Sequence, residues 1–216
     1  MLLNNILKLL FTFPAIIIAI VFHEFFHGYA AYKLGDDTPK QYGRLTLDPL
    51  KHIDIFGTII LPILLLISTN FSLAFGWAKP VPINFYRFKK IRRDLIITSL
   101  AGPLANIFLA FIFGLIFRFI IFPSPALSVS YLNVFVQYGV IINVVLAIFN
   151  LIPIPPLDGS KILFSLISKY PQDILKNQKI DIYGSLILIV LLFFGVINRL
   201  LGPIINQLVY LFLWIG

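Results

Sequence analysis

Long apolar runs constrain this 216-residue chain more than any other feature. They cover about residues 9–31, 95–122, 129–152 and 183–215, and a helix of such length can cross roughly 30 Å of hydrocarbon. Hydrophobic residues make up 59% of the chain and charged residues only 12%, well below the level usual in soluble domains. The sequence therefore predicts an all-α polytopic membrane protein with the lipid bilayer as its solvent.

The chain is expected to form a single membrane-embedded domain over residues 1–216, because it contains no internal repeat and no extramembrane segment long enough for a second domain. The first apolar run is longer than the core of a signal peptide, so we expect a retained span. Asn198, Arg199, Gly202 and Pro203 interrupt the last run. One span with a frayed end and two short spans are both compatible with this C-terminal region.

The charges favour a membrane over a nucleic acid as the surrounding partner. The net charge is +8, and its cations cluster in short stretches between the apolar runs, as the positive-inside pattern of membrane proteins requires. No nucleic-acid recognition motif accompanies them, so no nucleic-acid partner is expected. The absence of cysteine excludes disulfides, thiolate metal sites and cysteine nucleophiles.

A shorter apolar run at residues 55–68 determines the membrane topology of the chain. It holds Gly57 and Pro62 and is below spanning length. If this run dips into the membrane and returns, the next two spans bring Asp158 to the side where the first span ends; if it crosses, Asp158 arrives on the opposite side. The re-entrant path places most Lys and Arg residues on one side, so we expect that side to be cytoplasmic and the membrane to be the plasma membrane.

The strongest chemical signal is His23-Glu24-Phe25-Phe26-His27, an HExxH sequence inside the first span. Residues four apart share a helix face, so His23 and His27 can ligate one Zn²⁺ while Glu24 lies beside a metal-bound water as catalytic base. Ionisable groups are costly inside a bilayer, which makes such a cluster a functional site by default. The alternative is a polar cluster that only joins helices.

Zinc in a catalytic site needs a third protein ligand. Asp158 follows Pro153, Pro155 and Pro156, which unwind the helix, and its negative charge helps to offset that of the ion. A helix cap or turn residue is the alternative role for Asp158. His52 is the rival ligand, although its charged neighbours indicate a solvated loop.

Two further motifs make the chain resemble the site-2 protease family of intramembrane zinc proteases. They are Gly102-Pro103-Leu104-Ala105-Asn106 at a helix start, and an Asn150 followed by prolines and Leu157-Asp158-Gly159. The resemblance covers residues 9–163, the expected catalytic core. It implies His23, His27 and Asp158 as zinc ligands, Glu24 as the base, and Asn106 and Asn150 as residues that help to hold substrate. It also implies a three-helix core with a membrane-associated sheet after the first core helix. Many relatives carry a PDZ or a CBS module, and we expect neither in residues 1–216.

The residues themselves allow other roles for Asn106, for Asn150 and for the segment at residues 71–85. Small neighbours let helices approach closely at Asn106, so both it and Asn150 could serve interhelical hydrogen bonds instead. Aromatic residues and prolines over residues 71–85 indicate an edge strand that could hold substrate, or an interfacial anchor. A basic cluster follows that segment and is expected to contact anionic lipid: Arg87, Lys89, Lys90, Arg92 and Arg93.

The sequence thus predicts hydrolysis of peptide bonds in or near transmembrane segments of membrane-protein substrates, with one zinc ion per chain. A membrane metal transporter and a catalytically silent substrate-binding relative are the alternatives. Bis-histidine haem binding is excluded, because residues four apart on one helix cannot reach opposite faces of a haem. Substrate identity and oligomeric state remain open.

Overall fold

The computed structural model describes residues 2–60, 64, 76, 78–128 and 130–214. Four helical stretches among them are long and apolar enough to span a membrane: Leu10–Lys33, Ile91–Ile121, Tyr131–Asn150 and Val196–Leu213. The described residues form helices and connecting segments without a β-strand. The prediction of an all-α polytopic membrane protein is confirmed.

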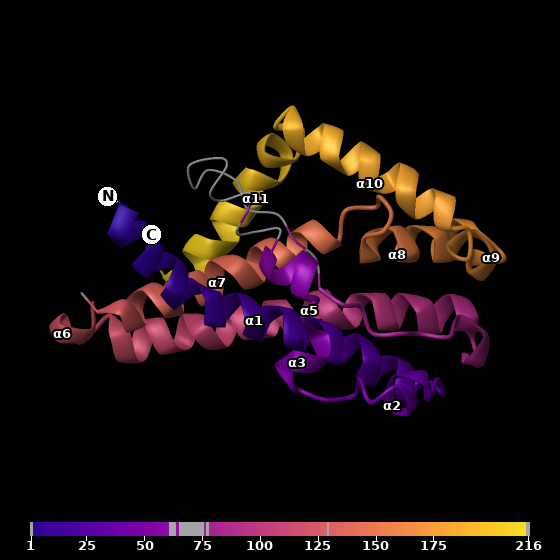
Figure 1. Ribbon diagram of the computed structural model, residues 1–216, viewed down its shortest axis with the longest axis horizontal. Coiled ribbons are helices and arrows are strands. Elements are labelled where there is room, and N and C mark those ends of the chain that lie inside the picture. Colours follow the sequence, from indigo (N-terminus) through magenta and orange to yellow (C-terminus); the bar gives the residue numbers. More distant parts are fainter. Residues whose placement is uncertain (1, 61–63, 65–75, 77, 129, 215–216) are drawn as a thin grey trace.

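Three long helices form the centre of the molecule: α1 (Leu2–Lys33), α5 (Ile91–Ile116) and α7 (Tyr131–Asn150). Each packs against the other two along its length (Figure 1). A π-helical stretch, η3 (Phe117–Ile121), extends α5, and α6 (Pro125–Ser128) lies in the turn to α7. This arrangement is the three-helix core that the sequence predicts.

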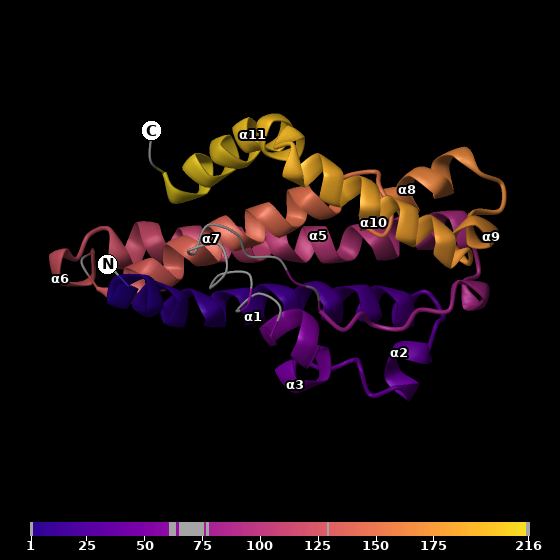
Figure 2. The ribbon, with the colours of Figure 1, turned by 45° about the horizontal axis from the view of Figure 1, so that its top comes forward.

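The direction of these helices places the end of α7 near the end of α1. Figure 2 shows that α1 ends, α5 begins and α7 ends at the same end of the bundle. The chain therefore leaves α1 and enters α5 at the same end of the bundle, as the re-entrant path of residues 55–68 requires. The first part of this segment is the π-helical η1 (Ile55–Ile60), and most of the rest lies outside the described residues, so its re-entrant path stays a prediction.

Short elements connect α1 to α5. They are α2 (Thr38–Gln41), α3 (Pro49–His52), η1 and the 3-10 helix η2 (Phe85–Arg87). The predicted edge strand at 71–85 falls partly outside the described residues, and its described part is not a strand. The reason is that the backbone there hydrogen-bonds to α1 and its neighbours: Lys79 N–H donates to His52 O at 3.0 Å and Asn84 N–H to an Asp36 carboxylate oxygen at 2.7 Å.

After α7 the chain turns sharply through the prolines and continues as α8 (Asp158–Ile167), α9 (Pro171–Leu175), α10 (Gln178–Phe193) and α11 (Val196–Leu213). The C-terminal region is thus two helices, of which α11 reaches spanning length. Gly195 separates them with a φ of +68°, a conformation that residues with a side chain rarely adopt. This break, and not Pro203, divides the region.

Candidate metal centre

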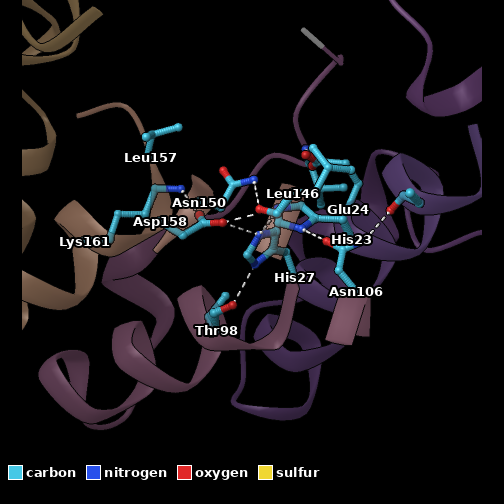
Figure 3. A network of polar contacts seen from close by, with 12 residues as sticks. His23, Glu24, His27, Thr98, Asn106, Leu146, Asn150, Leu157, Asp158 and Lys161 are labelled. Carbon is cyan, nitrogen blue, oxygen red and sulfur yellow. Dashed lines mark hydrogen bonds and ion pairs between the residues drawn. The ribbon is translucent and has the colours of Figure 1, made fainter. Parts of the chain in front are cut away.

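His23 and His27 lie one turn apart on α1 and face the start of α8, as Figure 3 shows. The Nε2 atoms of the two histidines are 3.0 Å apart. Asp158 Oδ2 lies 2.9 Å from His27 Nε2 and 3.2 Å from His23 Nε2. All three residues are less than 10% exposed. The structure therefore brings the three predicted ligands to one buried point, although 131 residues separate His27 from Asp158.

This triangle of atoms suits zinc. Tetrahedral zinc, with bonds of about 2.0–2.2 Å, holds its ligand atoms roughly 3.3–3.5 Å apart. The observed separations of 2.9–3.2 Å are slightly shorter, so the three atoms can ligate one ion after small adjustments. Within the part of the chain that the structure describes, this is the group of His, Asp and Glu residues arranged to hold a metal.

The hydrogen bonds behind the two histidines orient their rings toward one point. His27 Nδ1 lies 2.7 Å from the carbonyl oxygen of Thr98, which can only accept, so the proton is on Nδ1. His23 Nδ1 lies 2.7 Å from Asn106 Oδ1. Each ring thus turns its Nε2 toward the Asp158 carboxylate, which is the orientation in which the two histidines and the aspartate can ligate one cation.

Asn106 is fully buried on α5 and uses its whole amide group. Its Nδ2 donates to Ala19 O at 3.0 Å and to Asn143 Oδ1 at 2.8 Å, which leaves Oδ1 to accept from His23. Asn143, also fully buried, donates to Gly139 O on its own helix. Asn106 therefore orients a ligand, and its role in holding substrate stays a prediction.

Gly102, four residues before Asn106, makes room for the two rings. A Cβ at this position would overlap His27 Nε2 and lie 2.8 Å from His23 Cε1. The glycine of the Gly-Pro sequence is thus required for the close approach of α5 to the HExxH turn of α1. Its role is steric and local to the ligands.

Asn150 and Glu24 lie beside the three ligands but not among them. Asn150 is half-buried at the end of α7 and donates to Leu146 O at 2.9 Å, so a role toward substrate is untested. Glu24 Oε2 accepts the backbone N–H of Val81 at 2.8 Å. The extended segment before η2 therefore covers the glutamate of the motif.

Lys161 completes the environment of Asp158. Its Nζ lies 2.8 Å from Asp158 Oδ1, the oxygen that points away from the histidines. Burial alone would raise the pKa of the Asp158 carboxyl, but His27 and Lys161 outweigh it and hold that pKa well below its usual range. Burial likewise opposes the charge of Lys161, and Asp158 overrides it to raise the lysine pKa. Both neighbours therefore favour the anionic form of Asp158, the form in which a carboxyl group can ligate zinc.

His52 is not part of this group. It is fully buried, contrary to the expected solvated loop, because α3 packs against α1 and His52 Nε2 is paired with Thr46 O at 2.8 Å. His52, the rival third ligand, thus lies apart from the two histidines, whereas Asp158 lies beside them.

Sequence reasoning missed four contributors to the site. Thr98 and Val81 act through backbone atoms, so their side chains give no signal. Asn143 was detectable as a polar residue inside an apolar span, and Lys161 as a cation three residues after Asp158 on a helix. Neither pairing follows from local pattern alone.

The bundle of helices long enough to span a membrane thus contains a buried group of two histidines and one aspartate that could hold a metal ion. The model of "Peptidase family M50" matches residues 118–194, which include Asn150 and Asp158 but not the HExxH turn. The chain is similar to "Putative zinc metalloprotease YwhC" of Bacillus subtilis, with 39% identity over 194 residues, covering 88% of this chain and 84% of that protein. It is 30% identical to "Putative zinc metalloprotease Rip2" of Mycolicibacterium smegmatis, over 85% of this chain and 66% of that protein.

The chain belongs to peptidase family M50, the site-2 protease family. A third relative, "Putative zinc metalloprotease MJ0611" of Methanocaldococcus jannaschii, is 43% identical over 65 residues, which are 30% of this chain and 31% of that protein. No solved structure matches the chain. The predicted family is confirmed.

Proposed function

We propose that this protein is an intramembrane zinc metalloprotease that cuts peptide bonds in or beside transmembrane segments of membrane proteins. The observation that carries the proposal is the convergence of His23, His27 and Asp158 at a buried point between spanning helices. Both histidines belong to a span, so the bond to be cut must come to the membrane-embedded end of the bundle. The names of the relatives support the same chemistry.

The residues around the ligands would divide the work of hydrolysis. Zinc would supply Lewis acidity to a water molecule and to the scissile carbonyl. Glu24 follows His23 directly on α1, and the Val81 N–H fixes its Oε2. Its Oε1 has no hydrogen-bond partner within the described residues and would take a proton from the water and pass it to the leaving amine.

Access to a peptide bond requires that the substrate helix unwinds, because a helix encloses its own amide groups. Residues that weaken a helix, such as Gly and Pro, are therefore expected near the cut.

The test compares wild type with Glu24→Gln, which removes the base but keeps the shape of the side chain. Both proteins should hold about one zinc per chain in detergent, whereas Asp158→Ala should lose most of it. Each protein is then incubated with membranes from a strain that lacks the gene, and newly formed N-termini are labelled and identified by mass spectrometry. Wild type should create N-termini inside or beside apolar segments, and Glu24→Gln should create at least 100-fold fewer.

Two outcomes would contradict the proposal. Glu24→Gln that cuts as well as wild type would remove Glu24 from its role as base. If zinc-loaded wild type generates no new N-termini, the protein is better described as a catalytically silent relative. If zinc crosses proteoliposome membranes only when wild type is present, the transporter is favoured.

We further propose that the end of the bundle with the metal ligands faces the cytoplasm. The loops at that end contain most of the cations, which positive-inside topology retains there. Because the chain has no cysteine, the single variants Lys40→Cys and Ser124→Cys can be made. Lys40 lies on α2 and Ser124 directly precedes α6, and these two helices lie toward opposite ends of the bundle in Figure 2. A membrane-impermeant maleimide added to intact cells should label only the cysteine at position 124; labelling at position 40 alone would reverse the orientation.

A further inference from the structure

A pocket of about 500 Å³ opens at the end of the bundle where α5 begins and where α8 joins α9. These elements contact one another and lie together in Figures 1 and 2. Five cations line the pocket: Lys89, Lys90, Arg92, Arg93 and Lys169. It is separate from the metal ligands, none of which lines it.

Two of the five cations already have structural partners. Arg92 donates from Nε to Ser165 O and from a terminal nitrogen to Leu166 O, each at 2.8 Å, and so satisfies carbonyls at the end of α8. Arg93 pairs with the buried Asp94 carboxylate at 2.7 Å. These contacts fix the walls of the pocket.

The three lysines have no such partners. Lys89, Lys90 and Lys169 are exposed and form no ion pair with any described residue. Lys169 only lies 5.5 Å from the ring centre of its neighbour Tyr170. The pocket therefore has an excess of positive charge that the protein itself leaves unmatched.

Apolar side chains are exposed on the elements that form the pocket. Leu166, Ile167 and Tyr170 are 59%, 69% and 54% exposed. From the pocket α5 continues directly into its membrane span, where Ile97 is also exposed. Cations next to exposed apolar surface, at the polar end of a span, match a ligand with an anionic head and an apolar tail.

We propose that this basic pocket binds the headgroup of an anionic phospholipid, with the acyl chains along Leu166, Ile167 and α5. A soluble phosphate compound would use the same lysines but would gain nothing from the exposed apolar side chains. The three lysines supply the charge and the two arginines hold the pocket open. The site is independent of catalysis, because it is defined by residues that touch neither metal ligand nor Glu24.

The test measures lipid binding to the purified full chain by native mass spectrometry. Dioleoyl phosphatidylglycerol and dioleoyl phosphatidylcholine, which have the same acyl chains, are titrated against wild type, Lys89→Gln/Lys169→Gln and the control Lys51→Gln/Lys179→Gln. The control removes the same charge from exposed positions outside the pocket. Zinc content and thermal unfolding confirm that each variant is folded.

Wild type and the control should bind phosphatidylglycerol with similar affinity and well above phosphatidylcholine. The pocket variant should bind it about thirtyfold more weakly, since each lysine near an anionic lipid contributes roughly a factor of five. An equal loss in the two double variants, or equal binding of the two lipids, would overturn the proposal. Displacement of phosphatidylglycerol by an equal concentration of soluble glycerol phosphate would overturn it too, because the pocket would then be a site for small anions.

Discussion

The metal end of the three-helix core and the C-terminal helices α10 and α11 have similarly apolar sequences but differ in how much of their surface is buried. In the span Ile91–Ile121, which comprises α5 and η3, 44% of an apolar 18-residue stretch is buried, against 11% in Val196–Leu213 of α11. At the metal end even polar residues such as Asn106 and Asn143 are fully buried, and they bond to each other. On α10 and α11, Phe193 is 85% and Leu200 66% exposed.

This difference shows that apolar composition alone does not define a core in a membrane protein. Apolar side chains gain little by leaving lipid for protein, so close packing and buried polar contacts hold membrane helices together. The metal end has both, through Gly102 and through the hydrogen bonds of Asn106. Equivalent substitutions in the two regions should therefore have very different effects, and each variant below is matched to one in α10 or α11.

The largest expected effect is that of Gly102→Ala. The new Cβ would overlap His27 Nε2, and α5 is held too closely by α1 and α7 to move away. Overpacking of this kind costs about 1–3 kcal/mol, and we expect the upper end because the displaced atoms are ligands. Zinc affinity, measured by competition with a chelator, should fall roughly 100-fold.

Gly202→Ala on α11 is the matched control. A Cβ there would meet nothing within 4 Å, so zinc affinity and cleavage should be unchanged. If Gly102→Ala and Gly202→Ala lost zinc to a similar degree, the C-terminal helices would support the site as strongly as α5 does. The proposed difference between the metal end and the C-terminal helices would then be wrong.

Asn106→Ala is expected to have the next largest effect. It removes the acceptor from His23 Nδ1 and leaves Asn143 Oδ1 without its partner. Loss of a group that orients a metal ligand typically lowers metal affinity about 10–100-fold. The matched change, Asn198→Ala at an exposed position of α11, should leave zinc binding unaltered.

The kinetics of Asn106→Ala also separate two roles. If Asn106 only orients His23, saturating zinc should restore most of the cleavage rate. A rate that stays low with zinc fully bound would instead support the predicted role of Asn106 in holding substrate.

Much of this molecule follows from local sequence pattern. The apolar runs predict the first three spans to within four residues, because the length and hydropathy of a span are local properties. The last run, 183–215, is compatible with one span or with two, and among its described residues only Val196–Leu213 is a candidate span. His23 and His27 could be paired from their spacing alone, since a helix fixes their geometry. Asp158 could be proposed from the chemistry of zinc, but its position beside the histidines depends on the path of two intervening helices.

The contacts around the candidate metal ligands could not be predicted from the local sequence pattern. The predicted solvated loop at His52 is buried, since its surroundings come from α1 and not from its neighbours in sequence. The predicted strand before α5 instead bonds to Glu24 through the Val81 backbone. Backbone groups are the same in every residue, so no residue type reveals which one will approach a distant side chain.

The smallest expected effect is that of Lys161→Met, compared with Lys179→Met on α10. Lys161 holds the second oxygen of Asp158, but its side chain is 30% exposed, and such partly solvated ion pairs contribute only about 0.2–1 kcal/mol. Zinc affinity should therefore fall by no more than about fivefold, and Lys179→Met should not change it. A cleavage rate reduced more than 100-fold in zinc-saturated Lys161→Met would show that the lysine acts on the substrate itself, and the chemistry would then extend from α1 onto α8.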